Sequence, residues 1–97
     1  MIMTMFYVDD FGGHEEKIVV DFPPEHFQPM LVPQVLLRKW LEESLGDDGS
    51  GNIDDCMTTH TIDAVVHASP HTCVLVGTYE EMARVHWSLF VTLNKLP

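Results

Sequence analysis

The chain has 97 residues, 45% of them apolar, and its fifteen acids against five bases give a net charge of −10. A charge this negative disfavours direct binding to nucleic acid or to an anionic membrane, because both require a basic face. The apolar runs are far shorter than the roughly 20 residues that span a bilayer, and the apolar N-terminus lacks the positive flank of a signal peptide and is followed at once by acids. We therefore expect one domain over residues 1–97, a cytoplasmic location, and reduced thiols at Cys56 and Cys73.

The first third of the chain predicts a β-hairpin. Residues 2–8 and 17–22 are rich in β-branched and aromatic types, and Gly12 and Gly13 between them suit a turn. Pro23-Pro24 then ends the second strand, because proline cannot donate a hydrogen bond to a sheet. An irregular connection is expected up to residue 33, with four apolar residues available for packing: Phe27, Met30, Leu31 and Val32.

A helix is predicted to begin at Pro33, because proline suits the first helical turn. The following apolar residues recur with a period near 3.6 and are Val35, Leu36, Leu37, Trp40, Leu41 and Leu45. Gly46 lies where a helix C-cap is expected.

The second half predicts another hairpin and a second helix. Residues 59–68 and 72–77 are dominated by Val, Ile and Thr, and a short polar gap separates them. Thr78-x-x-Glu81 has the form of a helix capping box, which favours a helix running to Leu93, although Trp87, Leu89, Val91 and Leu93 also alternate as in a strand. The predicted order is β-β-α-β-β-α, an α+β fold with an antiparallel sheet and two helices on one face.

The stretch from Gly46 to Met57 resembles, in its middle, the calcium loop of an EF-hand. With Gly51 as the sixth position, ligand positions are filled by Asp48, Ser50, Asn52 and Asp54. Gly46 and Met57 stand where the first carboxylate and the bidentate glutamate are required. We therefore expect a helix C-cap and a polar turn instead of a metal site, its acids following a helix C-terminus whose dipole disfavours them.

A zinc site is a further alternative, because a hairpin could bring together two cysteines and two histidines: Cys56, His60, His71 and Cys73. Their spacing is not that of a zinc finger, so we expect no bound cofactor. No nucleophile, phosphate-loop or dinucleotide motif is present, and His86 on the apolar stripe is interpreted as a packing residue. We do not expect an enzyme.

Twelve of the fifteen acids form six adjacent pairs, and such pairs repel each other unless a cationic partner neutralises them. A groove that matches DNA phosphates, spaced ~3.4 Å along a strand, also accepts carboxylates. In size, charge and compactness the chain is similar to DNA-mimic anti-CRISPR and anti-restriction proteins of phages and to acidic immunity proteins. We therefore expect a non-enzymatic inhibitor of a basic, nucleic-acid-handling partner protein. The acids expected to contact it are Asp9, Asp10, Glu15, Glu16, Asp47, Asp48, Asp54 and Asp55.

The alternative is a structural or homo-oligomeric module, such as a homodimer, that associates through apolar contacts. Its expected interface residues on the last element are Trp87, Phe90 and Val91, with Met30 and Leu31 as further apolar groups.

Overall fold

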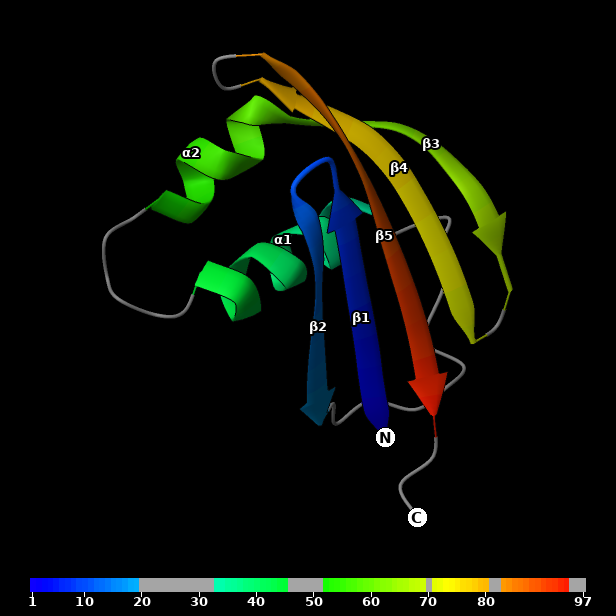
Figure 1. Cartoon of the computed structure of the whole chain (residues 1–97). Coiled ribbons are helices and arrows are strands. Elements are labelled where there is room, and N and C mark those ends of the chain that lie inside the picture. The colour runs from blue at the N-terminus through cyan, green and yellow to red at the C-terminus, as the bar shows by residue number, and fades with distance from the viewer. Residues whose placement is uncertain (20–32, 46–51, 70, 81–82, 95–97) are drawn as a thin grey trace.

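The computed structural model describes residues 1–19, 33–45, 52–69, 71–80 and 83–94, without the side chains of Leu45, Asn52, Asp54 and Asp55. These residues form a five-stranded antiparallel sheet and two helices (Figure 1). The elements are β1 (Ile2–Asp9), β2 (Gly12–Val19), α1 (Pro33–Leu45), α2 (Asn52–Thr59), β3 (His60–Ala68), β4 (Thr72–Glu80) and β5 (Arg84–Asn94).

The strand order is β2-β1-β5-β4-β3. Strands β3, β4 and β5 are consecutive in the chain and neighbours in the sheet, whereas β1 pairs with β5, with Phe6 opposite Phe90. The two ends of the described chain thus meet in the middle of the sheet. Two register shifts in β3, between Ile62 and Ala64 and between Val65 and His67, make this edge strand irregular.

The prediction of a helix for the last element is wrong. In β5 the residues at odd positions, from Val85 to Leu93, are buried and alternate with more exposed even positions. Thr78, the expected helix cap, is a residue of β4 that pairs with His86. Residues 84–94 form a strand because β5 pairs with β1 on one side and β4 on the other. These inter-strand hydrogen bonds outweigh the local helix propensity and cannot be predicted from the local sequence.

Helix α1 confirms the expectation of a helix from Pro33 to Leu45. Its buried residues are Leu36, Leu37, Trp40 and Leu41. They join Met3, Met5, Cys73, Leu75 and the odd-numbered residues of β5 in one core. The core is therefore formed between α1 and one face of the sheet.

Helix α2 was not expected, because residues 52–57 were assigned to a polar turn. Ile53, Cys56 and Met57 are spaced as one helical face and pack against the core. By position, Asp54 and Asp55 belong to the first turn of α2, where a helix dipole favours negative charge. The prediction that the dipole of a preceding helix C-terminus disfavours these two acids is therefore wrong.

Two strand boundaries also differ from expectation. The β1–β2 turn consists of Asp10 and Phe11, and Gly12, with φ 145°, already pairs with Asp9. Strand β4 continues through Gly77 to Glu80. Gly77 lies opposite Trp87, and a Cβ atom built on it would lie 2.5 Å from Trp87 Cζ2 and would collide with the Thr61 carbonyl oxygen. A residue without a side chain is therefore required where the Trp87 indole crosses β4.

The observed fold is a small compact domain with more sheet than helix, and α+β remains a consistent description. The expected connection of residues 23–32, with Phe27, Met30, Leu31 and Val32, and the expected end of the second strand at residue 22 lie outside the described residues. Neither α1 nor α2 is long and apolar enough to cross a membrane.

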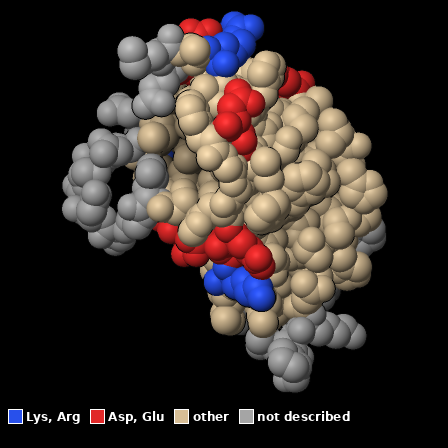
Figure 2. All heavy atoms as spheres, viewed as in Figure 1, with Lys and Arg blue, Asp and Glu red and all other residues tan. Residues whose placement is uncertain are grey.

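The sheet face opposite the helices, named here the open sheet face, carries charge at one edge, through Glu15 and Lys17 of β2, and at one end, through Glu80 and Arg84 of β4 and β5. Its other even-numbered residues on β1, β4 and β5 include no Lys, Arg, Asp or Glu and are Ile2, Thr4, Phe6, Val8, Thr72, Val74, Val76, Thr78, His86, Ser88, Phe90, Thr92 and Asn94. Phe6 and Phe90 are 41% and 43% exposed, and their ring centroids are 6.4 Å apart. Figure 2 shows separate acidic patches and a broad surface at the right without charged side chains.

Candidate functional site

A cleft of about 820 Å³ lies between the β1–β2 turn, the C-terminal halves of α1 and α2, and the end of β4. Six of its fourteen described lining residues are aromatic or histidine: Tyr7, Phe11, His14, Trp40, His60 and Tyr79. We call it the aromatic cleft. It lies at the end of the sheet where the chain turns from α2 into β3, so its residues come from six elements and one turn.

The wall of the aromatic cleft is built on Tyr7 and Trp40. Tyr7 of β1 points to the helix side of the sheet and stacks on Trp40 of α1, with ring centroids 5.2 Å apart and planes 9° from parallel. Trp87 lies behind them, with its ring centroid 6.0 Å from that of Tyr7. The Trp87 Nε1 atom is buried without a hydrogen-bond partner among the described residues. Because both tryptophans are buried, this wall is held by the core.

His60 and Tyr79 face each other across β3 and β4 at the mouth of the cleft. Their ring centroids are 4.8 Å apart, and His60 Nδ1 lies 2.7 Å from the Cys56 carbonyl oxygen. That oxygen can only accept, so Nδ1 carries the proton and Nε2 is the acceptor nitrogen of the neutral ring. Burial lowers the pKa of His60, partly opposed by the Cys56 hydrogen bond and the charge of Asp9, so the ring is neutral at pH 7.

Asp9 is the polar centre of the cleft. Its Oδ1 accepts a 2.8 Å hydrogen bond from the Phe11 amide, and its Oδ2 accepts a long one, 3.5 Å, from the Tyr79 hydroxyl. The Tyr7 hydroxyl also hydrogen-bonds Asp9, and burial followed by the Asp9 charge raises the pKa of Tyr7. Both tyrosines are therefore protonated donors around one half-buried carboxylate, and no Lys or Arg of the described residues forms an ion pair with it.

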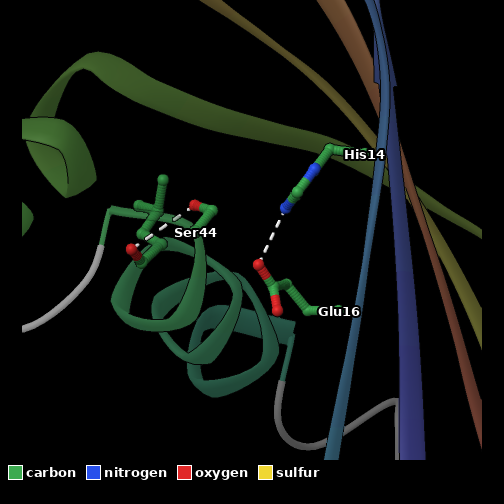
Figure 3. Close-up of polar contacts among 4 residues, drawn as sticks. His14, Glu16 and Ser44 are labelled. Atoms are coloured by element: carbon green, nitrogen blue, oxygen red, sulfur yellow. Dashed lines mark hydrogen bonds and ion pairs between the residues drawn. The ribbon is translucent and has the colours of Figure 1, made fainter.

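A second acid points into the space between β2 and α1. His14 Nε2 and Glu16 Oε1 are 2.7 Å apart, and Figure 3 shows both side chains extending from β2 toward α1, where Ser44 donates a 3.4 Å hydrogen bond to the Leu41 carbonyl. The His14 ring lies 5.6 Å from the ring of Trp40. Glu16 thus faces the helix side, whereas Glu15, its neighbour, faces the other side of β2 and pairs with Lys17 at 3.8 Å.

The eight acids predicted to contact a partner do not share one described face. Asp9 lines the cleft, Asp10 is exposed in the turn, and Glu15 and Glu16 lie on opposite faces of β2. Asp54 and Asp55 belong to α2, but their side chains lie outside the description, as do Asp47 and Asp48 entirely. Among the acids whose side chains are described, the structure therefore brings Asp9 and Asp10 together at one turn and separates Glu15 from Glu16.

The predicted apolar interface residues are divided between the core and the surface. Trp87 and Val91 are 2% and 1% exposed and pack within the chain, so the expectation that they form a contact surface is corrected. Phe90 points to the open sheet face. Met30 and Leu31 lie outside the described residues.

The zinc alternative is not supported by the geometry. His60 pairs with Tyr79 and Ala68 pairs with Cys73, so His60 and Cys73 lie at opposite ends of the β3–β4 ladder. At about 3.3 Å per residue, these two side chains are roughly 20 Å apart, too far to share one ion. No cluster of three or more His, Cys, Asp or Glu suited to a metal occurs among the described residues, and both cysteines are free thiols.

The aromatic cleft was not anticipated from the sequence. Tyr7, Trp40 and Tyr79 are far apart in the chain and were assigned to strands or helices without a functional role, and His60 was considered only as a zinc ligand. One signal was available: two histidines and two tyrosines stand near the ends of their strands, next to the loops in which binding residues concentrate.

Comparison of the chain with known protein families, curated proteins and solved structures gives no match.

Proposed function

We propose that the protein is a non-enzymatic acidic binding protein that engages a basic face of a partner protein, and that this partner handles nucleic acid. The observation that carries the proposal is the distribution of charge. Lys17, Arg38, Lys39 and Arg84 each lie 3.2–3.8 Å from a carboxylate of this chain. The cations with described side chains are thus occupied, and the surplus of acids that gives −10 remains for a partner.

The physical basis is competition with phosphate. A groove lined with Lys and Arg binds DNA by neutralising phosphates, and carboxylates at similar density occupy the same sites. Opposite fields also speed the encounter and make the affinity salt-dependent. Two classes of inhibitor use this principle: phage proteins that block restriction or CRISPR nucleases, and immunity proteins that block nuclease toxins.

Affinity capture with charge variants tests the proposal. One variant replaces Asp47, Asp48, Asp54 and Asp55 by Asn, and a second replaces the hairpin acids with Asp9→Asn, Asp10→Asn, Glu15→Gln and Glu16→Gln. The control carries Asp21→Asn, Glu25→Gln, Asp63→Asn and Glu81→Gln, which changes the net charge equally. We expect one of the first two variants to lose the basic partner, more strongly at low salt, while the control retains it.

Equal losses in all three variants would show that net charge alone acts, and no loss in the first two would refute the assignment of the acids. Duplex DNA provides a second criterion. It should displace the captured partner without binding this protein, and a partner indifferent to DNA would contradict the mimic mechanism.

A homodimer through the open sheet face is the second candidate. Phe6 and Phe90 form an exposed apolar pair there, and the only charged neighbours on the adjacent β2 strand, Glu15 and Lys17, have opposite signs, so two chains of charge −10 could meet at this face with limited repulsion. Size-exclusion chromatography with light scattering tests this candidate. We expect a dimer that persists at high salt. Phe90→Ser should dissociate this dimer, whereas Phe11→Ser, the same change at an exposed turn, should leave it intact. A wild-type monomer at all concentrations would refute it.

A further inference from the structure

We propose that the aromatic cleft receives an arginine side chain of the basic partner, with the guanidinium between the aromatic rings and the Asp9 carboxylate. This inference rests on the proposed function and deepens it, because it names the residue type that anchors the partner. It follows from three properties of the cleft: its rings, its unneutralised carboxylate and its size.

The rings provide a surface for an organic cation. Phe11 is 79% exposed at the rim, and Tyr7, His60 and Tyr79 are half-buried within the cleft. A cation close to an aromatic ring is attracted by the negative face of the ring, and arginine makes this contact more often than lysine. The guanidinium is planar, so it also stacks on such rings as an ammonium cannot.

The carboxylate provides the charge. Asp9 accepts hydrogen bonds from the Phe11 amide, Tyr7 and Tyr79, yet a carboxylate has about four acceptor positions, and these neutral donors leave its charge in place. Glu80 also belongs to the lining, but its carboxylate pairs with Arg84 at 3.2 Å, so the unpaired charge of the cleft is that of Asp9. None of the described lining residues is Lys or Arg, so no side chain of the described part already fills the role of the cation.

The size fits an extended side chain with adjacent backbone. Ligand clefts of roughly 300–1,000 Å³ hold small molecules or short peptide segments, and the aromatic cleft has about 820 Å³. Its apolar walls suit the methylene groups of arginine, and its carboxylate suits the tip. Lysine offers a similar stem but lacks the planar fork that pairs with a carboxylate.

The test uses the whole chain and a blocked tripeptide, acetyl-Gly-Arg-Gly-amide, followed by ¹H–¹⁵N NMR and tryptophan fluorescence at low salt. The matched ligand replaces arginine by citrulline, which keeps the shape and removes the charge. We expect saturable shifts at residues lining the cleft with the arginine peptide and binding at least tenfold weaker with citrulline. Equal binding of the two peptides, or no saturable shift with either, would overturn the proposal.

Two variants locate the site. Asp9→Asn retains the acceptor for the Phe11 amide and should weaken arginine binding about tenfold, the usual scale for losing a charged hydrogen-bond partner. Asp63→Asn, an equal change of charge on β3 outside the lining, should leave binding within about twofold. An equal loss in both variants would overturn the proposal, because it would indicate general electrostatic attraction.

Phe11→Leu provides the aromatic test without dependence on Asp9. Phe11 is exposed, so this variant keeps the fold even where Asp9→Asn disturbs the turn, and we expect two- to fivefold weaker binding from the lost cation–π contact. Unchanged binding would overturn the role of the rings. Agmatine, a free guanidinium amine, distinguishes the source of the ligand: binding tenfold tighter than the tripeptide would indicate a small-molecule site and overturn a partner's arginine.

Failure of this inference is separable from failure of the proposed function. If a basic partner is captured in a salt-sensitive way, Asp9→Asn still captures it, and no arginine binding is found, then the proposal for the aromatic cleft is wrong and the proposal for the acidic surface stands. If the arginine peptide binds but no basic partner is captured, the arginine site stands and the proposed function is wrong.

Discussion

Replacing Gly77 by Ala is expected to destabilise the fold because the added methyl group has no space. Its Cβ would lie 2.5 Å from Trp87 Cζ2 and would collide with the Thr61 carbonyl oxygen. Neither neighbour can retreat easily, since Thr61 belongs to a paired strand and Trp87 is buried in the core. Trp87 also supports the aromatic cleft through its ring contacts with Tyr7 and His60, so the substitution reaches the candidate site.

Two opposing effects determine the magnitude. Overpacking a core costs about 1–3 kcal/mol, and the upper half of that range applies where the obstacle is backbone. Removing a glycine from a strand recovers about 0.5–1 kcal/mol of chain entropy. The net loss is about 1–2 kcal/mol, which lowers the Tm of a domain of this size by roughly 5–15 °C.

Urea denaturation followed by tryptophan fluorescence and a calorimetric melt measure the effect. Gly13→Ala is the matched control, because its Cβ would meet Phe6 Cζ at 3.0 Å, the far end of a half-exposed ring that can move. We expect a change within about 0.5 kcal/mol for Gly13→Ala. Combining Gly77→Ala with Trp87→Phe should lose at least about 0.5 kcal/mol less than the sum of the two single changes. Equal stability of the Gly77→Ala and Gly13→Ala variants, or strict additivity with Trp87→Phe, would refute this account of the contact.

Three further outcomes are expected. Burial lowers the pKa of His60, so below about pH 6.5 the unfolded chain takes up a proton that the folded chain does not, and the protein becomes less stable as the pH decreases. His60→Gln should therefore reduce the dependence of the free energy of unfolding on pH between about pH 5.5 and 6.5. An unchanged dependence would contradict this. Burial raises the pKa of Cys73, so iodoacetamide should alkylate half-buried Cys56 first in the folded protein, as peptide mass mapping would show, and faster alkylation of Cys73 would be the opposite result. Leu37→Ala removes a fully buried side chain of α1 and should cost about 2–5 kcal/mol in urea denaturation, against less than about 0.5 kcal/mol for the exposed Val35→Ala, and similar costs would place α1 differently.

Local patterns predicted α1 and the first strand because one buried face repeats within each element. The buried residues of α1 recur at the helical period, and Met3 and Met5 alternate along β1. For the last element the same method fails, since Val85, Leu89 and Leu93 fit a helical face while Trp87 and Val91 complete a strand pattern. Pairing with β1 on one side and β4 on the other decides between them, and that information is distant in the sequence.

Helix α2 shows a different limit. Residues 46–51, which precede it, are all glycine, aspartate or serine, so turn signals concealed a helix of eight residues. The spacing of Ile53, Cys56 and Met57 was available, but it is short and gains its meaning from the core that it packs against. The aromatic cleft could not be predicted for a related reason, because topology alone brings Tyr7 beside Trp40 and His60 beside Tyr79.

The pairing of β1 with β5 has a consequence for how the molecule folds. The β1–β2 hairpin and the β3–β4–β5 meander are each local in sequence, whereas the seam between them joins residues more than 70 positions apart. The chain loses the entropy of closing this long loop before the contacts between β1 and β5 stabilise the fold. Folding is therefore expected to be slower than in helical domains of similar size. During synthesis, β1 therefore has an unpaired edge until β5 leaves the ribosome, and any delay there exposes Met3 and Met5 to aggregation instead of the core.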